Sequence, residues 1–103
     1  MPRKPLESLT ESMFYVLMAF QKEQRCGTEI ASFVEQKTHG LCRIGPATLY
    51  TILAKFEDEK YIKEVKVEGR KRTYAVTDKG RQAYVDEVAR LRRCVADAAS
   101  EEE

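Results

Sequence analysis

The sequence predicts a mainly α-helical fold with one small β-hairpin. Three observations support this fold class: a helix that opens with Gly45 and Pro46, a basic two-stranded hairpin over residues 61–76, and Thr77 in the capping position of a last helix. A short strand is also expected at residues 41–44, ahead of the first of these helices. Strand, helix and hairpin in this order are typical of a winged helix-turn-helix.

The first expected helix begins in an S-x-x-E capping box formed by Ser8 and Glu11, with Thr10 as the alternative cap, and runs to about Gln24. The apolar run at residues 13–20 covers almost its whole circumference. A helix that is apolar all round must be buried on two sides, so one face should meet its own domain and the other a second copy of the chain. The residues expected at that second contact are Met13 and Leu17.

A second helix is expected from Thr28, as its cap, to Thr38, with Gly40 beyond its end. With 103 residues, of which 43% are hydrophobic, the chain can build one core and has little room for a deep substrate pocket. A small binding protein is therefore favoured over an enzyme.

The helix that begins at Pro46 has one apolar and one polar face. Its core face is predicted by residues at i, i+3, i+4 and i+7, which are Leu49, Ile52, Leu53 and Phe56. Its other face carries hydroxyls, a phenol and an amine, at Thr48, Tyr50, Thr51 and Lys55. These groups can reach phosphates or base edges if the helix lies in a major groove of DNA. Taken alone, the pattern fits an ordinary amphipathic surface helix equally well.

The hairpin favours DNA binding. Gly69 lies between its two strands, where a turn requires positive φ, and it is followed by three cations, Arg70, Lys71 and Arg72. Such a cluster favours contact with a polyanion such as the phosphate backbone, although a solvated charged tip is the alternative. Residues 43–81 hold 10 Lys or Arg against 6 Asp or Glu, so the basic charge coincides with the elements proposed to contact DNA.

The last helix, capped by Thr77, carries apolar residues at steps of four, three, four and three. They are Tyr84, Val88, Leu91, Val95 and Ala98. This heptad seam favours a packed dimer helix, with coverage of the chain's own core as the alternative. Adjacent glutamates at a helix C-terminus oppose the macrodipole, so residues 100–103 should fray. We therefore expect a winged helix-turn-helix DNA-binding domain at residues 1–80 and a dimerisation helix with a frayed acidic tail at residues 81–103.

Nothing in the sequence indicates catalysis, a metal site, a cofactor or a membrane span. His39 is the only histidine, and no Cys-x-x-Cys or His-x-x-x-His spacing, phosphate-binding loop or nucleophile elbow is present. The longest apolar run, residues 13–20, is too short to cross a bilayer. Three widely spaced cysteines, Cys26, Cys42 and Cys94, indicate reduced thiols and hence a cytoplasmic protein.

Several stretches of the chain carry a family resemblance. The most specific is PATLYTIL at residues 46–53; others are residues 9–11, Gly27 with Glu29 and Ile30, Tyr61 with Ile62, and residues 77–80. Together they span roughly residues 9–92 and resemble the PadR family of bacterial transcriptional regulators. The similarity is strongest to its short subclass, which has a winged domain and a single C-terminal dimerisation helix.

The resemblance implies a homodimeric repressor on a pseudo-palindromic operator of double-stranded DNA, with recognition helices in successive major grooves and wings beside them. The residues that it places at the DNA are Thr48, Tyr50, Thr51, Lys55, Arg70, Lys71 and Arg72. It also implies a small aromatic effector at the dimer interface. The chain has no tryptophan, so a pocket that stacks planar drugs between paired indoles is not expected.

The alternative function is a winged-helix module that binds a protein or senses redox state. Cys94 lies beside Arg92 and Arg93, and nearby cations can lower a thiol pKa and make it reactive. A passive thiol on a dimer helix is the simpler account. Salt dependence separates these functions, because DNA binding releases counterions and an apolar protein contact does not.

Overall fold

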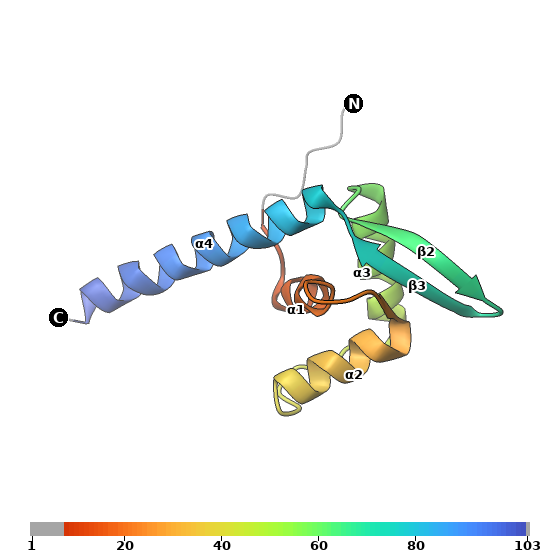
Figure 1. Ribbon diagram of the computed structural model, residues 1–103. Helices are drawn as coiled ribbons and strands as arrows, with labels where there is room; N and C mark the ends of the chain where they lie inside the picture. The colour runs from red at the N-terminus through yellow and green to blue at the C-terminus, as the bar shows by residue number, and fades with distance from the viewer. Residues whose placement is uncertain (1–7, 103) are drawn as a thin grey trace.

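The computed structural model describes residues 8–102 and confirms a mainly α-helical chain with a small antiparallel sheet (Figure 1). The elements in chain order are α1 (Glu11–Ala19), β1 (Arg25–Cys26), α2 (Gly27–Lys37), α3 (Pro46–Asp58), β2 (Ile62–Glu68), β3 (Lys71–Val76) and α4 (Asp78–Glu101). Helices α1, α2 and α3 pack together, the β2–β3 hairpin projects from one side of them, and α4 leaves on the other side (Figure 1). The hairpin is the wing of a winged helix-turn-helix.

The sheet has the order β1-β3-β2, so its third strand is not the one expected from the sequence. Strand β1 pairs with β3 through Arg25 opposite Tyr74, whereas residues 41–44 form a loop. The backbone hydrogen-bonding groups of Cys42 in this loop are paired with a side chain and not with a neighbouring strand. The Thr38 hydroxyl accepts from the Cys42 N–H at 3.0 Å and also lies 3.2 Å from the Cys42 carbonyl oxygen. The prediction of a strand at residues 41–44 is therefore wrong.

Helix α1 is capped by Thr10, whose Oγ1 accepts from the Met13 N–H at 3.2 Å, and not by the expected Ser8 capping box. It also ends at Ala19, five residues before Gln24. At this end two side chains from further along the chain bind backbone carbonyls: the Arg25 Nε donates to the Ala19 carbonyl at 2.6 Å and the Gln21 Nε2 to the Leu17 carbonyl at 3.0 Å. These bonds satisfy carbonyls that would otherwise favour another helical turn.

Helix α2 begins two residues earlier than expected, with Cys26 and not Thr28 in the capping position. The Glu29 carboxylate reaches back and accepts from the Cys26 N–H at 2.9 Å. Its end is close to the expected one, because Thr38 is the C-cap and Gly40 has a φ of +79°. The start of α3 at Pro46, with Gly45 before it, is confirmed.

The core lies between α1, α2, α3 and the base of the sheet. It contains the predicted apolar face of α3, and its most deeply buried members are Phe20, Phe56, Leu17, Ile30, Leu53, Val16 and Val34. Met13 is 6% exposed and Leu17 is fully buried within the single chain. Neither side chain therefore offers much surface to a second copy, and their assignment to the dimer contact stays a prediction.

Helix α4 is joined to the winged domain near its N-terminal end. The Thr77 cap is confirmed, because Oγ1 accepts from the Gly80 N–H at 3.0 Å. One turn later Tyr84 stacks on Phe14 of α1, with ring centroids 5.5 Å apart. The Glu87 carboxylate is buried and accepts from the Leu9 N–H at 2.7 Å, while Arg90 forms an ion pair with it from the next turn.

Beyond this contact with the winged domain, α4 continues as a helix to Glu101. The fraying expected at residues 100–103 stays a prediction, and Glu103 lies outside the described residues. No helix within residues 8–102 is long and apolar enough to cross a membrane.

Candidate nucleic-acid interface

The outward face of α3 carries all four residues that the sequence placed at DNA. Thr48, Tyr50, Thr51 and Lys55 are exposed, while the opposite face of the helix is buried in the core. Tyr50 is 66% exposed, which is unusual for so large a side chain and leaves its ring available for a partner. The Thr51 hydroxyl donates to the Ala47 carbonyl at 2.9 Å, one turn earlier in the helix.

The cations of the wing differ in how they are paired. Arg72 lies 3.7 Å from the Glu64 carboxylate across the hairpin, and Lys66 lies 3.1 Å from Glu68. No ion pair within the described part of the chain involves Arg70 or Lys71, which are both exposed. From the sequence, the three cations of the tip are expected to be equivalent. In the structure, Arg72 differs from the other two because it has a carboxylate partner.

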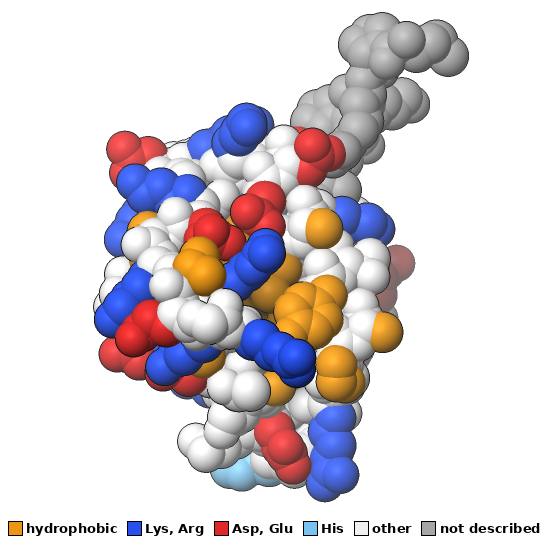
Figure 2. Space-filling model, turned by 90° about the vertical axis from the view of Figure 1, so that its right-hand side faces the viewer, with side chains coloured by type: hydrophobic (Ala, Val, Ile, Leu, Met, Phe, Trp, Pro, Cys, Tyr) orange, Lys and Arg blue, Asp and Glu red, His pale blue; other side chains and the backbone are white. Residues whose placement is uncertain are grey.

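A groove of about 540 Å³ separates α3 from the wing. It is lined by Cys26, Gly27, Thr28, Tyr50, Leu53, Arg70, Lys71, Arg72 and Tyr74. Figure 2 shows this side of the molecule, where hydrophobic side chains near the centre are flanked by Lys and Arg. The groove therefore brings Tyr50 of α3 together with all three predicted cations of the wing, although Thr48, Thr51 and Lys55 do not line it.

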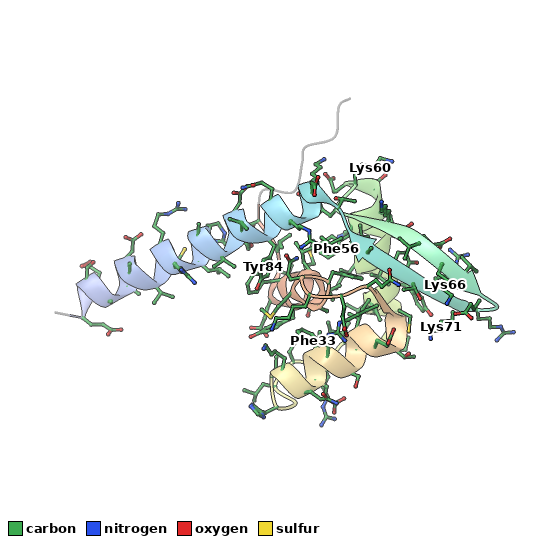
Figure 3. The ribbon with its side chains drawn as sticks, viewed as in Figure 1. Phe33, Phe56, Lys60, Lys66, Lys71 and Tyr84 are labelled. Carbon is green, nitrogen blue, oxygen red and sulfur yellow. The ribbon has the colours of Figure 1, made fainter. Side chains whose placement is uncertain are left out.

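Sequence reasoning missed the inner wall of this groove. Tyr74 is only 5% exposed, and burial raises the pKa of its phenol, which therefore stays neutral. Thr28 and Cys26 reach the groove because β1 pairs with β3, a contact between residues almost fifty positions apart. Figure 3 shows Lys66 and Lys71 on the wing, on the opposite side of the molecule from the free end of α4.

A second, apolar groove of about 320 Å³ lies between α1 and α4. It is lined by Phe14, Val88, Leu91, Arg92 and Val95, so three predicted dimer residues share one surface. Val95 is 69% exposed. Tyr84, the fourth seam residue in the dimer prediction, does not line the groove because its ring stacks on Phe14.

The described residues contain no group of three or more His, Cys, Asp or Glu side chains that could hold a metal ion. Cys26 and Cys42 are buried and Cys94 is exposed on α4, all three as free thiols.

Comparisons with known proteins agree with this architecture. The DNA-binding protein TubR of Clostridium botulinum C phage is 29% identical over 66 residues, which are 64% of this chain and 82% of TubR. A transcriptional regulator from Clostridium thermocellum, Cth-833, has a TM-score of 0.78 with 26% identity and covers 86% of this chain and 87% of its own. Bacillus subtilis PadR in complex with operator DNA shares the fold, with a TM-score of 0.65 and 24% identity over 74% of this chain and 45% of that one.

The family comparison covers most of the folded chain. Residues 16–86, from the middle of α1 to the first turns of α4, match the transcriptional regulator PadR-like family. Members of this family are DNA-binding transcriptional regulators and not enzymes. The chain belongs to the PadR-like family of transcriptional regulators.

Proposed function

We propose that this regulator is a homodimeric repressor of the short PadR subclass, which binds a pseudo-palindromic operator in the cytoplasm of a bacterium. Each copy places α3 in a major groove and its wing on the neighbouring backbone. The observation that carries this proposal is the groove between α3 and the wing, where exposed Tyr50 faces the unpaired cations Arg70 and Lys71. An exposed aromatic ring beside free cations suits a polyanion that also presents stacked bases.

The residues of this surface have different proposed roles. Thr48, Tyr50 and Thr51 contact bases or adjacent phosphates from the outward face of α3, and Lys55 contacts phosphate from its last turn. Arg70 and Lys71 bind phosphate directly, because neither forms an ion pair within the described part of the chain, and only the charge of the Glu29 carboxylate acts on Lys71 from a distance. Arg72 must first break its ion pair with Glu64, so it contributes less to the affinity for DNA than Arg70 or Lys71 does.

Substitution of the free wing cations tests the DNA contact. We expect Arg70→Ala with Lys71→Ala to weaken operator binding, and to reduce the slope of log affinity against log salt by about 2, because two phosphate contacts no longer release counterions. The operator can be found by footprinting the protein on its own upstream DNA, and the slope measured by fluorescence anisotropy.

The matched control is Lys22→Ala with Arg93→Ala, which removes two exposed cations outside the groove. It should leave the slope nearly unchanged. An identical slope for the wing variant and the wild type would contradict a role of the wing at phosphate.

The dimer contact is proposed to lie on the apolar groove of α1 and α4. Val88, Leu91 and Val95 occupy the seam positions, and Phe14 replaces the buried Met13 and Leu17 as the contribution of α1. A small aromatic effector, if the regulator responds to one, would bind at this interface, where the described chain offers an apolar surface with Arg92 at its edge.

Acidic substitutions at Leu91 and Val95 test whether the apolar groove of α1 and α4 forms the dimer contact. We expect Leu91→Glu with Val95→Glu to make the protein monomeric at concentrations where the wild type is dimeric, because apposed carboxylates cannot be buried without partners. Sedimentation velocity gives the readout. Val85→Glu is the control, since Val85 is 57% exposed on α4 but does not line the groove. If both variants kept the mass of the wild type, the seam would not be the interface.

The alternative function of protein binding or redox sensing has less support. Cys94 is exposed, and its sulfur lies 3.8 Å from Nη1 of Arg90. It lines neither the groove beside the wing nor the apolar groove of α1 and α4.

A further inference from the structure

Ahead of Lys55, the outward face of α3 lacks the side chains that usually read purines. Arg and Lys bind guanine, and Asn and Gln bind adenine, through paired hydrogen bonds in the major groove. Helix α3 contains no Arg, Asn or Gln, and its single Lys, Lys55, lies in the last turn. Between Pro46 and Lys55 it exposes only hydroxyls, one phenol and methyl groups, at Ala47, Thr48, Tyr50, Thr51 and Ala54. Base discrimination by this stretch must therefore rest on few hydrogen bonds and on apolar contact.

The hydroxyl of Thr51 is already engaged. It donates its one hydrogen to the Ala47 carbonyl at 2.9 Å, a bond within the helix. The side chain is exposed, so the part that remains free to meet a base consists of its methyl group and the acceptor side of the oxygen. Ala47 lies one turn earlier on the same face, and its Cβ adds a second methyl beside that of Thr51.

We propose that Thr51, together with Ala47, reads the 5-methyl group of a thymine in each operator half-site. Thymine is the base that presents a methyl group in the major groove, and Ala and Thr methyls are suited to contact it. The proposal rests on the proposed placement of α3 in the major groove, and makes Thr51 a specificity-determining residue. The competing role for Thr51, acceptance of a hydrogen bond from a base amine by the hydroxyl, predicts the opposite response to substitution.

Replacement of thymine by deoxyuridine removes only the methyl group and tests this assignment. In a footprinted operator, each thymine is replaced in turn, symmetrically in both half-sites, and affinity is measured for wild type, Thr51→Ser and Thr51→Val. For the wild type we expect one position per half-site at which replacement weakens binding, by roughly 4-fold for each methyl and roughly 15-fold for the pair. Thr51→Ser keeps the hydroxyl and removes one of the two methyl contacts, so it should lose most of the preference for thymine over deoxyuridine at that position and keep only the part due to Ala47. Thr51→Val keeps a methyl and should retain the preference for thymine.

Three results would overturn the proposal. The wild type could bind every deoxyuridine operator as tightly as the thymine operator. The serine variant could keep the full preference, which would assign the contact with the thymine methyl to a residue other than Thr51. The valine variant could lose it while serine keeps it, which would assign the contact to the hydroxyl. In each case wild-type binding to the intact operator would still stand, whereas failure of the wild type to bind any upstream DNA would count against the proposed function itself.

Discussion

A Gly80→Ala substitution is expected to lower the free energy of unfolding by about 3 kcal/mol or more, the largest effect expected for alanine at any of the five glycines. Gly80 lies in the first turn of α4 and is buried. A Cβ there would overlap the carbonyl oxygen of Tyr61 and lie 2.8 Å from Cγ2 of Val76. The obstacle is backbone, which cannot swing away as the end of a flexible side chain can.

The Tyr61 carbonyl is also held in place from a second direction. It accepts from the Thr77 N–H at 2.9 Å, and the Thr77 hydroxyl lies 3.1 Å from it. Any shift that makes room for a methyl at Gly80 therefore breaks the bonds that start α4. Chemical denaturation followed by circular dichroism measures the loss.

Gly45→Ala is the matched control for Gly80→Ala. Gly45 precedes α3 with a φ of −72°, and nothing lies within 4 Å of the position that its Cβ would take. Its unfolding free energy should change by less than about 1 kcal/mol, because an ordinary residue can adopt this conformation and only the preference at the cap is lost. Equal denaturation midpoints for the Gly80 variant and the wild type would show that the contact with Tyr61 does not hold α4.

Removal of the Glu87 carboxylate should produce the next largest loss, about 2 to 3 kcal/mol for Glu87→Ala. The Glu87 side chain is 4% exposed and accepts from the Leu9 N–H at 2.7 Å while it pairs with Arg90. Alanine leaves that N–H without its acceptor and the guanidinium without its anion. Because Glu87 joins the segment before α1 to α4, the loss should appear in global unfolding.

The same carboxylate makes stability depend on pH in a defined direction. The hydrogen bond from Arg90 lowers the pKa of Glu87 below its ordinary value of 4.5, burial opposes this shift, and the Leu9 N–H adds to it. A carboxyl whose pKa is lower in the folded state stabilises the fold above its unfolded pKa, and this contribution disappears as the pH falls through the folded pKa. The difference in unfolding free energy between wild type and Glu87→Gln should therefore shrink below pH 4.5.

Urea denaturation from about pH 7 down to about pH 3 covers this window. Asp86→Asn is the control, because Asp86 is exposed and its carboxylate accepts a hydrogen bond from Gln82 Nε2 of the same helix, at 2.8 Å. It should change stability by less than about 0.5 kcal/mol at every pH. A constant difference between wild type and Glu87→Gln across the titration would mean that the charge of Glu87 does not contribute.

Features with a local stereochemical cause were predictable from the sequence. Pro46 starts α3 because its fixed φ suits the first helical position, and Thr77 caps α4 because a hydroxyl there can accept from the third helical N–H. Gly69 forms the hairpin turn with a φ of +62°. In each case the residue itself carries the signal, and the outward face of α3 follows from the same periodicity.

Features caused by distant partners were not predictable. The two-residue strand β1 has no periodicity of its own and exists because Arg25 faces Tyr74. The end of α1 depends on the same Arg25, whose side chain binds a carbonyl of the helix. The burial of Glu87 depends on the Leu9 N–H, 78 positions away, so an acid on an amphipathic helix gave no sign of it.

Continuity of α4 from Asp78 to Glu101 limits how its length can change during evolution. The helix is bound to the segment before α1 through Glu87, and Leu91 and Val95 line the apolar groove about one to two turns further along. One residue inserted between Glu87 and Leu91 would rotate Leu91 and Val95 by about 100° around the helix axis, onto another side of the molecule. Seven residues would return them to within about 20° while moving them about 10 Å outward. With the dimer contact proposed at Leu91 and Val95, insertions and deletions in this segment should be tolerated by their angular phase more than by their size, and lineages that lengthen α4 should do so in whole heptads.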